Sequence, residues 1–339
     1  MPVVVLVLCA LIFGAGGDDW PVAIVDDAKS KRSAAIVDSI EDSRSRITPY
    51  FRIVEEDSDK ADQMINDGRL QLKIHIPADF EATNRIYIST YNINSDATKN
   101  LRMRVTNALN AYDVRDGRLP LSVDLRTVES EDVPRTAFIA GGVLLLALFF
   151  GAALIAANLF ALEHEERTSK VILLSPIGPA GAAIGAMVTG TMVAFLTAVP
   201  TYLIGWLAFG LAPEAGAILL VLLFMIPLMF ACAGVGVLLA QMLRVHRNIQ
   251  PLIILTCIAT FFAAGGFVSV GGLPPAARGF AAVWPLSRVF EWNNPVLHQF
   301  VNNYSTSQWV WVWIAAVVGL LAGFFAGYRE RLAVQQGGQ

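Results

Sequence analysis

The chain has 339 residues, of which 55% are hydrophobic and only 16% are charged, below the roughly 25% typical of soluble domains. Residues 18–135 hold 17 of the 25 Lys and Arg residues and 22 of the 28 Asp and Glu residues. This segregation excludes a single soluble domain and predicts an α-helical polytopic membrane bundle with one inserted soluble domain. The net charge of −3, without a basic cluster, argues against nucleic acid as a partner.

Residues 1–17 form the first apolar segment. A membrane-spanning helix needs about 20 mostly apolar residues, and Pro2–Gly17 is shorter than that. A signal peptide is the alternative, but the segment lacks a basic start and has only a weak cleavage signal. We expect residues 1–17 to be a first span, the outer part of a longer helix.

Residues 18–135 are expected to form a small α/β domain with its own core, because strand-like alternation and helical spacing follow each other along the chain. The predicted strands are 21–26, 50–55, 70–76, 85–91 and 121–128, and the predicted helices are 31–44, 58–67 and 96–112. Ser58 is expected to cap the second of these helices, and Gly68 to follow its end.

No catalytic residue and no metal site is predicted. His75, the only histidine of this domain, lies in an alternating strand, and the acidic residues at 55–62 do not match an EF-hand loop. The three cysteines, Cys9, Cys232 and Cys257, lie in apolar runs without the spacing of metal ligands.

Residues 136–339 are expected to form a five-span transmembrane domain, which makes about six spans in all. The predicted spans are 138–162, 180–209, 215–243, 249–270 and 309–328, and 265–300 is expected to contain a re-entrant stretch on the outer side. Glycines repeat every four residues at 319, 323 and 327, and at 181 and 185. This spacing lets helices approach closely, either within the chain or across a dimer.

The short loops predict the orientation. Six basic residues follow the ends of spans on one side: Arg167, Lys170, Arg244, Arg247, Arg329 and Arg331. Basic residues in short loops favour the cytoplasm. We therefore expect a multi-pass protein of the cell membrane, with loops 163–178 and 244–248 and the C-terminus in the cytoplasm and residues 18–135 outside.

The most informative loop follows the second span. Charged residues at 163–167 are followed by the apolar run Val171–Leu174 and by Ser175-Pro176. This pattern is typical of a short amphipathic helix at the membrane surface. A plain charged turn that fixes the topology is the alternative reading.

This loop resembles the permeases of the type-two ABC transporter membrane family, in the branch with a large extracellular domain after the first span. The matching residues are Glu163, Glu165, Glu166, Thr168, Leu173, Leu174, Ser175 and Pro176. The segment Ile76–Phe80 resembles a recurring Ile-Pro-x-x-Phe motif of the same family, and the resemblance extends over nearly the whole chain. Arg167 departs from the usual Gly, and Ala186 from a common Lys.

The resemblance implies that the chain is the permease subunit of an ABC-type exporter. Glu163 to Pro176, Arg167 included, would form the coupling helix that docks on a separate ABC ATPase, present in two copies. A second permease chain, identical or different, would complete the complex. ATP and Mg²⁺ would be bound by the ATPase, and this chain would bind no cofactor itself. Consistently, no Gly-Lys pair of a phosphate-binding loop occurs in the sequence.

The spans carry almost no ionisable residues, which disfavours an ion relay and favours a lipid-like, drug-like or peptide-like cargo. Candidate residues of the substrate path are Asn158, Thr197, Gln241 and Thr260 in the spans, with Arg288 and Glu291 in the outer stretch. Hydrogen bonds between helices and interfacial anchoring are the alternative roles of these residues.

Two other functions remain open. One is a sodium-efflux permease of the same architecture, which the scarcity of acidic residues in the spans disfavours. The other is a membrane-anchored binding or sensing protein whose outer domain does the work, although six spans are more than an anchor requires.

Overall fold

The computed structural model describes residues 20–336 except 45–48, 117–120, 130–131 and 167. The chain divides into two compact units. The first unit combines the chain up to Ile139 with Phe262–Glu291, and the second combines Ala140–Phe261 with the chain from Trp292 onward. The expected first span, 1–17, lies outside the described residues.

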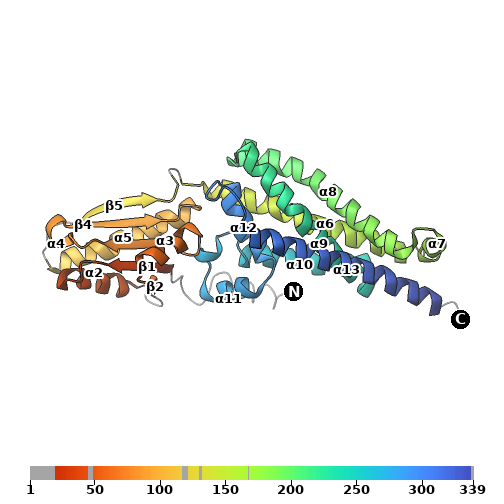
Figure 1. The fold of residues 1–339 in the computed structure, drawn as a ribbon, viewed down its shortest axis with the longest axis horizontal. Helices are drawn as coiled ribbons and strands as arrows, with labels where there is room; N and C mark the ends of the chain where they lie inside the picture. The colour runs from red at the N-terminus through yellow and green to blue at the C-terminus, as the bar shows by residue number, and fades with distance from the viewer. Residues whose placement is uncertain (1–19, 45–48, 117–120, 130–131, 167, 337–339) are drawn as a thin grey trace. The chain divides into compact units, whose positions relative to one another are not determined.

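The first unit is built on a five-stranded sheet with strand order β2-β1-β3-β4-β5 (Figure 1). The strands are β1 (Trp20–Asp26), β2 (Phe51–Glu55), β3 (Leu72–Ile76), β4 (Arg85–Thr90) and β5 (Ser122–Thr127). β1 pairs in parallel with both β2 and β3, β4 runs antiparallel to β3, and β5 is parallel to β4. The helices of this part are α2 (Lys31–Glu41), α3 (Ser58–Asn66), α4 (Phe80–Thr83) and α5 (Ser95–Asp116).

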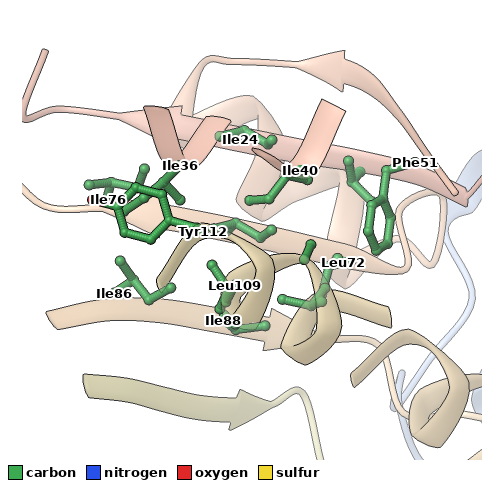
Figure 2. Close-up of a cluster of buried hydrophobic side chains, with 14 of the residues drawn as sticks. Ile24, Ile36, Ile40, Phe51, Leu72, Ile76, Ile86, Ile88, Leu109 and Tyr112 are labelled. Carbon is green, nitrogen blue, oxygen red and sulfur yellow. The ribbon is translucent and has the colours of Figure 1, made fainter. Parts of the chain in front are cut away.

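The core of this unit lies between the sheet and the pair α2 and α5, as Figure 2 shows. The two helices pack against each other, and the Ser39 hydroxyl donates to the Ala108 carbonyl at 2.9 Å. The side chains of the core are large and apolar, and each contributes about 1.5–3 kcal/mol when fully buried. They include Ile24, Ile36, Ile40, Phe51, Leu72, Ile76, Ile86, Ile88, Leu109 and Tyr112.

The other face of the sheet is covered at β3 by α3. Lys73 alternates with the core residues Leu72 and Ile74 and therefore points to this face. Its ammonium group donates to Asp62 at 2.6 Å and to the Ser58 carbonyl at 3.2 Å. The N-cap of α3 is Asp57, which accepts from the Lys60 amide at 3.0 Å, one residue before the predicted cap Ser58.

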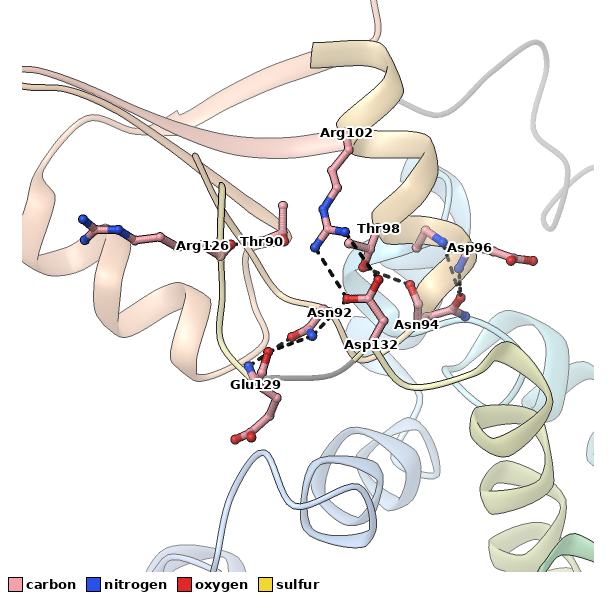
Figure 3. A network of polar contacts seen from close by, with 10 residues as sticks. Thr90, Asn92, Asn94, Asp96, Thr98, Arg102, Arg126, Glu129 and Asp132 are labelled. Atoms are coloured by element: carbon pink, nitrogen blue, oxygen red, sulfur yellow. Dashed lines mark hydrogen bonds and ion pairs between the residues drawn. The ribbon is translucent and has the colours of Figure 1, made fainter. Parts of the chain in front are cut away.

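A polar network fixes the segment between β5 and the next helix (Figure 3). The buried side-chain amide of Asn92 donates to the Glu129 carbonyl at 3.1 Å and accepts from the Glu129 amide at 3.2 Å. It also donates to Asp132 at 3.1 Å, and Asp132 pairs with Arg102 at 3.4 Å. The Val133 amide donates to the Asn92 carbonyl, which adds a backbone contact. The segment is therefore held on the domain by specific contacts.

The first unit also contains a compact hairpin. It includes η1 (Val270–Gly272) and α11 (Pro275–Val283) and leads into α12 (Ser287–Leu297). A Cβ atom at Gly271 would lie 2.7 Å from the Gln71 side chain, and one at Gly272 would lie 3.1 Å from the Trp20 ring. η1 therefore packs closely on the residues that begin β1 and precede β3.

The second unit is a helical bundle. It contains α7 (Ser169–Leu174), α8 (Gly178–Phe209), α9 (Ala215–Leu243) and α13 (Thr306–Gln336), with most of α6 (Arg135–Glu165) and of α10 (His246–Ala263). Within the described residues, four helices are long and apolar enough to cross a membrane: α6, α8, α9 and Thr306–Arg329 of α13. The polytopic membrane bundle is thus supported, while the count of six spans stays a prediction.

The predicted span 249–270 differs from the structure. α10 ends at Ala263, and Gly265 follows with φ +109°, a conformation that side-chain-bearing residues rarely adopt. At 1.5 Å per residue the 18 residues of α10 extend about 27 Å, slightly less than the hydrocarbon core of a bilayer. The apolar run continues past Ala263, but the helix does not.

Small residues set the contacts between the long helices. A Cβ at Gly319 of α13 would lie 2.4 Å from the Ala231 backbone of α9, so the two helices touch through their backbones. Gly323 faces Met187 of α8, and Gly327 faces the Ala180 backbone. All three glycines of the repeat therefore pack within the chain.

Candidate functional site

The loop that resembles a coupling segment is a hydrogen-bonded link between α6 and α8. The Glu163 carbonyl accepts from both the amide and the hydroxyl of Thr168, each at 3.1 Å. The Thr168 carbonyl in turn accepts from the Val171 amide in the first turn of α7. Thr168 thus hydrogen-bonds both to the last turn of α6 and to the first turn of α7.

Ser175 forms the turn between α7 and α8, at the other end of the link. Its hydroxyl donates to the Ile172 carbonyl at 2.7 Å and accepts from the Gly178 amide at 3.2 Å. Pro176 follows it, where the missing amide and the fixed φ of proline favour a break between helices. Glu163, Thr168, Leu173, Leu174, Ser175 and Pro176 therefore lie in one link, whereas Arg167 lies outside the described residues.

Apolar side chains of the link face outward. Leu174 is 87% exposed, Ile177 is 73% exposed and Val171 is 70% exposed. These three large apolar side chains, on or next to a six-residue helix, are thus mostly exposed within the described part of the chain. Such a patch is typical of a surface that meets another protein or lipid.

Glu165 makes a contact that sequence reasoning did not find. Its carboxylate accepts the backbone amide of His246 at 2.8 Å and lies 2.7 Å from Nδ1 of the same residue. His246 is the first residue of α10, in the other loop that was expected to be cytoplasmic. The pair therefore joins the two loops, which are 81 residues apart in sequence. The sequence could not predict this pair. Acidic residues near helix ends and histidines at helix starts are both common, and neither indicates which residue it contacts.

Two of the predicted path residues make hydrogen bonds within their own helices. Thr197 and Thr260 each donate to a carbonyl of their own helix, Ala194 and Thr256 respectively. The Asn158 side-chain oxygen is buried without a hydrogen-bond partner, and Gln241 is buried on α9.

Arg288 and Glu291 belong to the first unit, whereas these four residues belong to the second. They form an ion pair with each other one turn apart on α12, and Arg288 also donates to the Ala282 carbonyl at 3.3 Å. Both contacts are local to the first unit. The substrate path remains a prediction.

Within the part of the chain that the structure describes, no group of three or more His, Cys, Asp or Glu side chains is placed to hold a metal ion.

The sequence pattern of the family described as ABC-2 family transporter protein matches residues 1–328. The chain belongs to the ABC-2 transporter family. Members of this family are the transmembrane, non-ATPase components of ABC transporters, so this ABC-2 protein is a membrane component with an implied ABC ATPase partner. No curated protein matches the chain.

Proposed function

We propose that this ABC-2 protein is the permease subunit of an exporter, and that the link from Glu163 to Gly178 docks on the ATPase. The observation that carries the proposal is the exposed apolar surface of the link, formed by Val171, Leu174 and Ile177. It lies between two of the four candidate spans, where a signal from an ATPase can reach two membrane helices at once.

The charges beside this surface suit the same role. Glu163 and Glu166 lie on the α6 side of α7, and charged residues at the edge of an apolar contact set its orientation and specificity. Because Glu165 contacts His246, a movement of the link would also be transmitted to α10. The ATPase would thereby act on three helices through one docking site.

The rest of the proposed complex follows the family. Two ATPase copies would bind ATP and Mg²⁺, and a second permease chain, identical or different, would complete the membrane path. Residues 20–127, which hold the sheet, would lie outside the cell. The proposed cargo is lipid-like, drug-like or peptide-like, since the candidate spans carry few ionisable residues.

The test is recovery of the ATPase with the tagged full-length chain from detergent-solubilised membranes. Leu174→Asp places a charge in the proposed contact without removing a buried side chain. Because central apolar residues of interfaces contribute about 2 kcal/mol or more, we expect ATPase recovery to fall at least about tenfold. The ATPase is identified by its phosphate-binding loop in mass spectra.

A matched control is Val283→Asp in α11, which changes an equally exposed apolar residue of the first unit. We expect it to retain the ATPase. The proposal is wrong if no ATPase accompanies the unaltered chain, or if Leu174→Asp and Val283→Asp recover equal amounts.

A further inference from the structure

The segment 265–274, which we call the strap, follows α10 and contains η1. It belongs to the same compact unit as the sheet. A Cβ atom at Gly271 would lie 3.3 Å from Cγ of Gln71, and one at Gly272 would lie 3.1 Å from Cη2 of Trp20. At both points the strap therefore meets the sheet-bearing part with its backbone and not with an interlocking side chain.

The apolar side chains of the strap pack elsewhere. Leu273 forms a cluster with Ala277 and Ala281 of α11, and Val268 and Val270 pack against this cluster. Among the described residues, none belongs both to this cluster and to the core between the sheet and the helices α2 and α5. The strap and α11 thus share a small hydrophobic core of their own.

The contact between the strap and the sheet-bearing part holds polar atoms that the described residues leave without a hydrogen bond. Gln71 is fully buried, and both its side-chain nitrogen and its side-chain oxygen are of this kind. So are Nε1 of Trp20 and the hydroxyl of Ser269, the residue before η1. Nearly all buried polar groups in native proteins have a partner, and a group without one disfavours the state that buries it.

We propose that the strap docks reversibly on the sheet-bearing part, covering Trp20 and Gln71 in one state and leaving them to water in another. Release hydrates the carboxamide of Gln71, whereas the cluster shared with α11 stays intact. The hinge is Gly265, two residues after the end of α10, where φ is +109°. Glycine accepts backbone angles that other residues rarely adopt, so the chain can turn there at little cost.

The strap also continues the chain of α10, whose first residue contacts Glu165 of the link. A movement of α10 would therefore reach the strap along one continuous segment. This role in transport rests on the proposed function, whereas the docking equilibrium does not.

The first test measures release in the full-length chain in nanodiscs, without an ATPase. In a chain with all three cysteines replaced by Ser, Ser269→Cys places a thiol where the hydroxyl is buried. A water-soluble maleimide reaches this thiol only when the strap is released, so the labelling rate reports release. Gln71→Met keeps an unbranched side chain and removes both polar atoms, which favours the docked state. We expect labelling to become about tenfold slower.

Gln63→Met is the matched control, because Gln63 is exposed on α3. It should leave the labelling rate of Ser269→Cys unchanged. Glu56→Cys, on an exposed turn, verifies that the reagent is active, and thermal unfolding of each variant verifies that the fold is kept.

The second test locks the docked state. In the same background, Gln71→Cys and Gly271→Cys bring two thiols within reach of a disulfide, since a Cβ atom at 271 would lie 3.3 Å from Cγ of Gln71. We expect mild oxidation to form this disulfide, detected as linked peptides by mass spectrometry. In a complex with the ATPase, oxidation should lower ATP hydrolysis and reduction should restore it.

The inference is overturned if Ser269→Cys stays unlabelled in the folded chain, or if Gln71→Met does not slow its labelling. It is also overturned if Gln63→Met slows labelling equally, or if the disulfide does not form, because the docked contact would then be absent. Unchanged ATP hydrolysis in the locked complex would refute the role of the strap in transport. The absence of any ATPase would refute the proposed function instead, and the labelling result would still stand.

Discussion

At the scale of single residues, Glu165 shows how a contact within the chain changes the reading of an acidic run. The sequence places Glu163, Glu165 and Glu166 together as one acidic face for a partner. In the structure, the Glu165 carboxylate accepts the backbone amide of His246 at 2.8 Å, so it caps the first turn of α10. A negative charge at this end of a helix is also favoured by the helix dipole. The docking role of all three residues stays a prediction.

This cap predicts a local effect of Glu165→Ala. Loss of a capping side chain costs about 1 kcal/mol, so the first turn of α10 should open about five times more often. Hydrogen exchange of the peptide that contains His246 should quicken by that factor, measured by mass spectrometry. Glu166→Ala removes a neighbouring carboxylate as the control and should leave this peptide unchanged. Equal exchange in both variants would contradict the cap.

At the scale of elements, the strands could be predicted well because each combines alternation with a clear turn at its ends. The five predicted strands agree with the observed ones to within two residues at each end. The pairing could not be predicted: nothing in the alternation of β3 and β4 shows that they are antiparallel while β4 and β5 are parallel. Strand pairing depends on contacts between distant segments, which a local pattern does not record.

The positions of the long helices could also be predicted from the sequence, but not all of their ends and contacts. Hydropathy located α6, α8, α9 and α13, but it extended α10 through Gly265, because hydropathy reports burial and not the φ angle at which a helix stops. The glycine repeat at 181 and 185 is a second example. Such a repeat predicts a close contact, and no other helix among the described residues makes one at Gly181 or Gly185.

The polar segment between β5 and α6 gives a prediction at this scale. Asn92 is fully buried and satisfies both the amide and the carbonyl of Glu129. Asn92→Ala leaves these groups and Asp132 without that partner, which should cost about 2 kcal/mol and loosen the segment. A lower melting temperature and faster proteolysis between 128 and 134 would verify it. Asn66→Ala, at the exposed end of α3, is the control. Unchanged proteolysis would show that the network does not hold the segment.

At the scale of the whole molecule, membership of the ABC-2 family and four apolar helices establish a membrane protein. Which part faces the cytoplasm rests on a different argument, the distribution of charge. Six basic residues follow predicted span ends on the side expected to hold loop 163–178: Arg167, Lys170, Arg244, Arg247, Arg329 and Arg331. Since basic residues in short loops resist translocation, this side is predicted to be cytoplasmic and the sheet of the first unit to be outside.

The orientation can be tested with single cysteines, because the sheet-bearing part 20–127 contains none. In a chain with Cys9, Cys232 and Cys257 replaced by Ser, Glu56→Cys places a thiol on an exposed turn before α3. Leu174→Cys places one on the exposed face of α7. A membrane-impermeant maleimide added to intact cells should label Glu56→Cys at once and Leu174→Cys only after permeabilisation, because the bilayer shields the second thiol. Immediate labelling of Leu174→Cys would place α7 outside, and docking on a cytoplasmic ATPase would then be impossible.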